Sequence, residues 1–269
     1  MRRVIRTIIS GTVLLTALLA TVALADVKSP ATETAHSSAG MDQLMRMASF
    51  LAQLKQLSVA QQSGYDVVQD SGQKIEFLEN RKLVFDRPDR FRVDAQRSNG
   101  ESYAIAFDGQ AITVFSLTKK LYASSKIKGD IDSAITYYVK DLGMRFPLAM
   151  LYVINLPDEF GRRVREAEIV ETLILNGVSY FHLVVRADNV DFQVLLPETG
   201  DPLPLRIVIT YKFEVGQPQY WANFSNWNLS PNPPESSFFP NIPKDADRIQ
   251  FFAEPPIVAT PPIGKGEKK

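Results

Sequence analysis

Histidine is the side chain best suited to acid–base chemistry near neutral pH, and the chain has only two. His182 lies between Phe181 and Leu183 in a segment that alternates like a β-strand, and His36 lies in a small, polar stretch. A serine hydrolase needs a histidine beside a nucleophilic hydroxyl, and no G-x-S-x-G motif occurs. We therefore interpret His182 as a polar residue of a sheet and expect no enzyme activity. A hydrolase that uses His182 is the alternative.

Metal and cofactor chemistry has little support in the sequence. The chain has no cysteine, which excludes thiolate zinc sites, iron–sulfur clusters and cysteine nucleophiles. It has no H-E-x-x-H motif, no phosphate-binding loop and no G-x-G-x-x-G motif. Two carboxylate pairs, Asp130 with Asp132 and Asp188 with Asp191, fit helix caps and turns better than acid–base catalysis. We expect no metal, no cofactor and no catalytic residue.

The segment Arg87-Pro88-Asp89-Arg90 places two arginines at a corner between predicted strands. These arginines could hold an anionic group. A solvated turn is the simpler interpretation, because proline and aspartate are common turn residues.

The distribution of charge along the chain indicates a cellular location. The chain balances 30 Lys and Arg against 30 Asp and Glu, but residues 1–25 hold three arginines and no acid. After a basic start, an apolar stretch ends at Ala23-Leu24-Ala25, which is typical of a signal peptide with a signal peptidase site at Ala23 and Ala25. A retained membrane anchor is the alternative.

Removal of residues 1–25 would leave a slightly acidic protein, which argues against sequence-independent binding to nucleic acid. No later segment has the length and apolar character of a membrane span. Without a cysteine for lipid attachment, we expect a soluble periplasmic protein. Residues 26–40 are small and polar and predict a disordered leader, and residues 253–269 predict a disordered tail rich in proline and lysine.

Residues 41–252 predict a single domain of ten to twelve antiparallel strands with two or three helices. Apolar residues follow a helical period over 41–57, and from Ser58 the period falls to two. Residues 131–142 predict a second helix, with Asp130 or Asp132 as its cap and Gly143 at its end. A short apolar helical turn follows from Pro147 to Leu151.

The clearest strand runs from Leu203 to Val215 and places every second residue on one apolar face. A large sheet must cover such a face, either by closing into a barrel or by packing helices on it. With so few helices the cover could be incomplete, and a partly covered apolar face is a candidate ligand pocket. A simple hydrophobic core is the alternative. The expected wall of the pocket is Ile207, Ile209, Tyr211, Phe213, Trp221 and Trp227.

The two tryptophans differ by an even number of positions, so a regular strand would place them on one face. Core packing is the simpler interpretation of both, and an aromatic rim is the alternative. The expected lid over the pocket is formed by Ile135, Tyr138, Leu148 and Leu151.

Several blocks in fixed order resemble a bacterial family of predicted periplasmic proteins of unknown function, over about residues 41–252. The blocks are Gly72-Gln73-Lys74, Arg87–Val93, Phe107-Asp108-Gly109, Asp130–Ala134, Leu142-Gly143, Pro147-Leu148, Asn176-Gly177-Val178, His182-Leu183, Asp191-Phe192-Gln193, Gly200–Pro204, Ile209-Thr210-Tyr211, Pro218-Gln219-Tyr220 and Asn226-Trp227-Asn228.

That family is similar in fold to the LolA/LolB lipoprotein carriers and to the N-terminal domain of the sigma-factor regulator RseB. The resemblance implies an unclosed antiparallel half-barrel whose helices cover an apolar concave face that accepts acyl chains. It transfers no catalytic residues. LolB-type proteins are lipoproteins, whereas this chain lacks the cysteine that lipid attachment needs.

Two functions follow as expectations. The first is a soluble periplasmic carrier that holds a lipid or the acyl chain of a lipoprotein without covalent chemistry. The second is a module that binds an envelope protein or senses envelope stress and has no lipid ligand.

Overall fold

The computed structural model describes residues 33–251, with side chains from residue 39 onward. The expected signal peptide with Ala23 and Ala25, and the expected tail 253–269, lie outside the described residues and stay predictions. No helix in the described part is long and apolar enough to cross a membrane.

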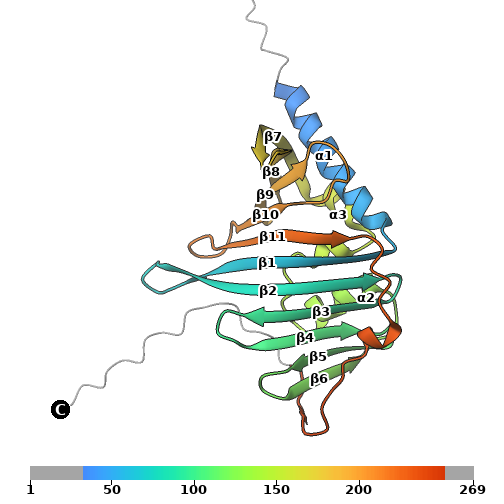
Figure 1. Ribbon diagram of the computed structural model, residues 1–269. Coiled ribbons are helices and arrows are strands. Elements are labelled where there is room, and N and C mark those ends of the chain that lie inside the picture. The colour runs from blue at the N-terminus through green and yellow to red at the C-terminus, as the bar shows by residue number, and fades with distance from the viewer. Residues whose placement is uncertain (1–32, 252–269) are drawn as a thin grey trace, which may run out of the picture. The chain divides into compact units, whose positions relative to one another are not determined.

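One open sheet of twelve strands dominates the described residues, in the order β12-β6-β5-β4-β3-β2-β1-β11-β10-β9-β8-β7 (Figure 1). Neighbouring strands are antiparallel except β12 and β6, and the sheet does not close into a barrel because its order ends at β12 and β7. This confirms the predicted fold class. The strands are β1 (Gln56–Val68), β2 (Lys74–Asp86), β3 (Arg90–Arg97), β4 (Ser102–Phe107), β5 (Ala111–Ser116), β6 (Leu121–Lys126), β7 (Val164–Leu175), β8 (Val178–Ala187), β9 (Val190–Pro197), β10 (Arg206–Tyr211), β11 (Gln219–Asn228) and β12 (Asp247–Arg248).

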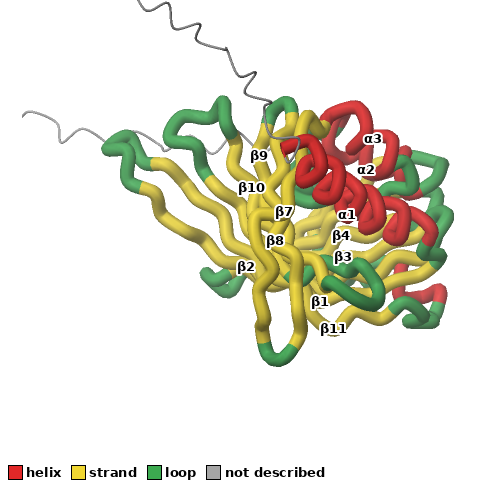
Figure 2. Tube along the Cα trace, turned by 90° about the horizontal axis from the view of Figure 1, so that it is seen from above, coloured by secondary structure: helices red, strands yellow, loops and turns green. Residues whose placement is uncertain are grey.

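The longer helices gather on one face of the sheet, toward one end of its strands (Figure 2). We call this side the helix face. The helices are α1 (Glu33–Gln53), α2 (Ile131–Thr136) and α3 (Leu156–Arg163), with a π-helix (Tyr137–Asp141) and two 3-10 turns (Ala149–Tyr152 and Glu235–Phe238). The hairpin ends of β1–β2 and β10–β11 extend away from the helices.

The core begins as two apolar rows that cross β1 to β5 on the helix face. One row is Leu57, Phe85, Phe91, Phe107 and Ile112, and the other is Val59, Leu83, Val93, Ile105 and Val114. All of these side chains are buried except that of Val114, which is half-buried. The rows confirm the period of two that the sequence predicts for this part of the chain.

Helix α1 packs on β7 and buries the predicted stripe of Leu44, Met47, Ala48 and Leu51. It begins at Glu33, so the predicted disordered leader is wrong over residues 33–40. At Gly40 the helix passes close to β7, because a Cβ atom there would lie 2.4 Å from the backbone oxygen of Ala167. A residue without a side chain lets the helix approach the strand, a role that composition alone does not reveal.

Gly40→Ala is therefore expected to destabilise the protein by about 1–3 kcal/mol, because the added methyl group meets backbone that has little freedom to move. Gly161→Ala in α3 is the matched control, since its Cβ would meet nothing within 4 Å. There the gain in helix propensity should stabilise by up to about 1 kcal/mol. Urea denaturation measures both, and equal effects would refute the close contact between α1 and β7.

Two elements differ from those that the sequence predicts. Helix α3 has no counterpart among the predicted helices, and Pro157 lies in its first turn, with acids following it and Arg162 and Arg163 in the last turn. Proline suits the first turn of a helix, because the N–H groups there have no carbonyl partner within the helix and proline has no N–H. Strand β10 is also shorter than the predicted 203–215. It starts after Pro204 and ends where the Tyr211 amide donates to the Pro218 carbonyl, closing the hairpin to β11.

Candidate ligand-binding face

The predicted lid residues lie over the helix face and are packed on it. Ile135, Tyr138 and Leu151 are buried, and Leu148 is half-buried against the core. The space beneath the lid is filled by aromatic rings. Tyr152 stacks on Phe85 with ring centroids 4.4 Å apart, Phe85 stacks on Phe91 at 5.4 Å, and Phe146 lies beside Phe91. The part of the face under the lid is therefore hydrophobic core in this structure.

The helix face continues beyond the helices as an apolar surface that solvent reaches. Tyr65 and Phe77 are direct partners in the β1–β2 register and stack with ring centroids 5.7 Å apart. Phe77 is 41% exposed and Ile75, two residues closer to the hairpin tip, is 39% exposed. We call Tyr65, Ile75, Phe77, Ile209 and Tyr211 the open face.

The expected wall residues of β10 lie on the helix face. Ile207 is buried, opposite Ala222 and Val194, and Ile209 and Tyr211 are half-buried against the same core. Their position matches the predicted alternation of β10, and their contact with a ligand stays a prediction.

Phe213 is not part of the wall, because it lies in the turn after β10 and is 78% exposed. Trp221, which was also expected in the wall, is not on the helix face. It lies on the opposite face, where its Nε1 donates to Glu76 Oε2 at 2.7 Å and its ring lies beneath Arg206. Trp227 packs on the core against Phe224. A register shift opposite Ser58 and Ala60, with Asn226 at φ 55°, breaks the alternation that would have placed both tryptophans together.

A buried polar group separates the core rows from the open face. Its members are Gln61 and Ser63 on β1 and Glu79 and Arg81 on β2, all less than 9% exposed, and we call them the polar belt. Gln61 lies opposite Arg81 and Ser63 lies opposite Glu79. The sequence interpretation missed the belt, although its signal is simple: four polar residues occupy inward positions of two strands whose other inward residues are apolar.

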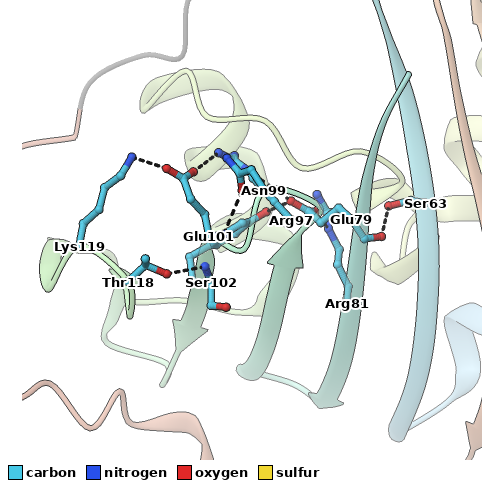
Figure 3. A network of polar contacts seen from close by, with 10 residues as sticks. Ser63, Glu79, Arg81, Arg97, Asn99, Glu101, Ser102, Thr118 and Lys119 are labelled. Carbon is cyan, nitrogen blue, oxygen red and sulfur yellow. Dashed lines mark hydrogen bonds and ion pairs between the residues drawn. The ribbon is translucent and has the colours of Figure 1, made fainter. Parts of the chain in front are cut away.

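Glu79 is the centre of the belt (Figure 3). Its Oε1 accepts from Arg81 Nε. Its Oε2 accepts from Tyr103 Oη at 2.9 Å and lies 3.4 Å from Arg97 Nε. Its backbone oxygen accepts from Ser63 Oγ at 3.1 Å. Burial acts to lower the pKa of Arg81, but the nearby oxygens of Tyr103, Tyr220 and Glu79 outweigh it and raise that pKa, so Arg81 stays charged.

The tyrosines around the belt are held in the neutral form. Burial raises the pKa of Tyr103 to about 12 and also raises the pKa of Tyr211 to about 12. Burial likewise raises the pKa values of Tyr152 and Tyr220 above the ordinary value. A tyrosinate in any of these positions would lose most of its hydration, and protein groups would not fully replace the lost interactions with water.

Raised pKa values predict a stability that depends on alkaline pH. Because the neutral phenols are favoured in the folded state, their contribution is complete below the unfolded value of about 10 and is lost as pH rises toward about 12. Absorbance of tyrosinate at 295 nm should therefore show four tyrosines that ionise late, together with unfolding. Tyr103→Phe should remove one of them. Ionisation of all tyrosines near pH 10 in the folded protein would contradict this.

Arg87 joins the lid to the sheet, rather than forming a solvated turn or an anion site. Its Nη1 donates to the backbone oxygens of Leu51, at 3.2 Å, and Leu54 at the end of α1. Its Nη2 donates to the Tyr152 oxygen at 2.7 Å. Burial lowers the pKa of Arg87, and the charge of Asp132 opposes that effect. One guanidinium thus satisfies carbonyls of two segments that are far apart in sequence.

The other candidate residues have structural partners. Both ring nitrogens of His182 are occupied, Nδ1 by Glu171 Oε1 and Nε2 by Gln193 Oε1, each at 2.9 Å. Asp130 accepts from the Ser133 amide at 2.8 Å and caps α2, as predicted, and Asp132 accepts from the Ile154 amide at 3.0 Å. Within the described residues, no cluster of three His, Cys, Asp or Glu side chains is placed to hold a metal.

Comparison with solved structures finds similar folds at low identity. A LolA superfamily protein from Nitrosomonas europaea is 11% identical, with a TM-score of 0.36 over 75% of this chain and 98% of its own. The Mycobacterium tuberculosis lipoprotein LppX is 13% identical, with a TM-score of 0.43 over 73% and 97%. A structure of the Pseudomonas aeruginosa MucA/MucB complex is 16% identical, with a TM-score of 0.37 over 76% and 61%. These similarities concern the fold alone.

A comparison with curated proteins finds no match. A family model, in contrast, matches residues 40–252 and is described as a predicted periplasmic protein, DUF2092. This confirms the resemblance drawn from the sequence blocks and agrees with the expected periplasmic location. Since the match covers well over half of the chain, the protein belongs to the DUF2092 family of predicted periplasmic proteins.

Proposed function

We propose that this protein is a periplasmic carrier that holds a lipid, or the acyl chain of a lipoprotein, by burial and without covalent chemistry. The observation that supports the proposal is the open face. Its apolar side chains lie on the same face of the sheet as the core, beyond the polar belt, and Phe77 and Ile75 are both more than a third exposed. A patch of exposed apolar side chains is typical of a binding site.

Complete burial of an acyl chain would supply enough free energy for capture. Each CH₂ group removed from water contributes about 0.8 kcal/mol, so a long acyl chain offers on the order of 10 kcal/mol before ordering costs. The aromatic side chains under the lid already occupy the covered part of the face. A ligand therefore first meets the open face, and deeper entry would require movement of the lid.

Uptake of a fluorescent fatty acid tests the proposal. Phe77→Asp should weaken binding at least tenfold, because it places a charge in the stacked pair with Tyr65. Phe213→Asp is the matched control, since this phenylalanine is exposed in the turn after β10 and is expected to leave binding unchanged. Absence of uptake by the unmodified protein would refute the carrier function.

A protein-binding module is the second candidate, and a separate observation favours it. Phe213 and Val215 in the β10–β11 turn, and Ile174 at the end of β7, are each more than 70% exposed. Apolar side chains at loop tips suit contact with an envelope protein. Capture of one defined envelope protein, with or without lipid, and its loss in Val215→Asp would support this function over the carrier.

A further inference from the structure

Three buried polar atoms on the helix face have no hydrogen-bond partner within the described residues. They are Arg81 Nη1, Gln61 Oε1 and the Tyr152 hydroxyl. These residues are 8%, 2% and 0% exposed, so bulk water does not satisfy the three atoms. An unpaired buried polar group is costly, and native proteins seldom keep one without a reason.

The three atoms belong to one place. Gln61 lies opposite Arg81 in the β1–β2 register. Arg81 lies over the ring of Phe146, 6.0 Å from its centroid, and that ring lies beside Tyr152 with centroids 6.5 Å apart. Gln61 Nε2 donates at 2.6 Å to the Tyr220 hydroxyl. The unpaired groups thus lie in one region, between the polar belt and Tyr152.

The pairing of charges in this place leaves donors without an acceptor. Arg81 and Arg97 both contact the carboxylate of Glu79, and Arg97 also pairs with Glu101 at 3.3 Å. Both oxygens of Glu79 have partners, the second also accepting from Tyr103 at 2.9 Å. Arg81 Nη1 and the Tyr152 hydroxyl are two unpaired donors, which match the two oxygens of one carboxylate. Gln61 Oε1 is an unpaired acceptor, which matches a hydroxyl or a water.

We propose that the polar belt and Tyr152 bind the carboxylate end of an acyl ligand. Arg81 Nη1 and the Tyr152 hydroxyl would donate to its two oxygens, and the chain would lie on the open face. Tyr65 and Phe77 are next to Ser63 and Glu79 along β1 and β2, so a chain anchored at Arg81 has apolar surface beside it. This inference rests on the proposed function and adds the chemistry of the head group.

Three twelve-carbon ligands test it: dodecanoate, methyl dodecanoate and dodecyl phosphate, each titrated by calorimetry into the unmodified protein and into Tyr152→Phe. The unmodified protein should bind dodecanoate at least tenfold more tightly than the methyl ester. Tyr152→Phe keeps the ring stacked on Phe85 and removes only the hydroxyl. It should weaken dodecanoate binding about three- to tenfold, leave the ester unchanged and cause no loss of thermal stability.

Tyr137→Phe is the matched control, because the Tyr137 hydroxyl pairs with Ser125 Oγ at 2.7 Å. It should leave the preference for the carboxylate intact. A double variant, Glu79→Gln with Arg81→Met, avoids leaving one charge unpaired and should abolish the preference. Equal binding of acid and ester would overturn this inference and leave the carrier function standing. Tighter binding of dodecyl phosphate would overturn the carboxylate assignment, and failure of all three ligands to bind would overturn both proposals.

Discussion

Phe85→Ala is expected to lower the free energy of unfolding by about 3–5 kcal/mol, the usual cost of removing a fully buried phenylalanine side chain. Phe85 is 0% exposed and lies between Phe91 on the next strand and Tyr152 of the lid, at centroid distances of 5.4 and 4.4 Å. The cavity would open where sheet and lid meet, so the loss should appear in urea denaturation together with faster proteolysis of the lid segment.

Phe213→Ala is the control for the same chemical change. Because Phe213 is 78% exposed, its truncation should change stability by no more than about 0.5 kcal/mol. A comparable loss at both positions would mean that Phe213 is buried and that the turn after β10 is wrongly placed.

Glu79→Ala is expected to cost about 3–5 kcal/mol, because it leaves the guanidinium of Arg81 buried without its counter-charge. The same change also removes the acceptor for Tyr103 Oη. Replacement of both partners, Glu79→Gln with Arg81→Met, should recover much of this loss, since the penalty comes from one uncompensated charge rather than from the absent pair.

Glu235→Ala serves as the matched control. Glu235 also pairs with an arginine, Arg90 at 3.7 Å, but its side chain is 73% exposed. The expected loss is below about 1 kcal/mol because water screens the pair. If the variant that combines Glu79→Gln with Arg81→Met is as unstable as Glu79→Ala, then Glu79 acts through packing and not through charge.

The parts of the fold that the sequence predicted are those in which local pattern and burial agree. Phe91 and Val93 alternate with Arg90, Arg92 and Asp94, and a period of two leaves little choice about their common face. The N-cap at Asp130 was predictable because it bonds only three residues away. Both features arise within one element or between adjacent strands.

The parts that were missed depend on exceptions to the pattern or on contacts far apart in sequence. A bulge separates Trp221 from Trp227, and periodicity cannot locate a bulge in advance. Arg87 bonds carbonyls at Leu51, Leu54 and Tyr152, and backbone acceptors leave no mark in a sequence. The belt has a different origin: its four polar residues come together only through the register of β1 with β2, which a pattern within one strand does not give.

Photo-crosslinking with a diazirine-labelled fatty acid tests the central claim most directly, because it reports both whether an acyl chain binds and where. The full-length protein is irradiated with the ligand, digested and mapped by mass spectrometry, with unlabelled fatty acid as competitor. The carrier account predicts competable crosslinks in the peptides that contain Tyr65, Phe77 and Tyr211. Crosslinks confined to the exposed turn of Phe213 and Val215, or none that the competitor removes, would contradict it.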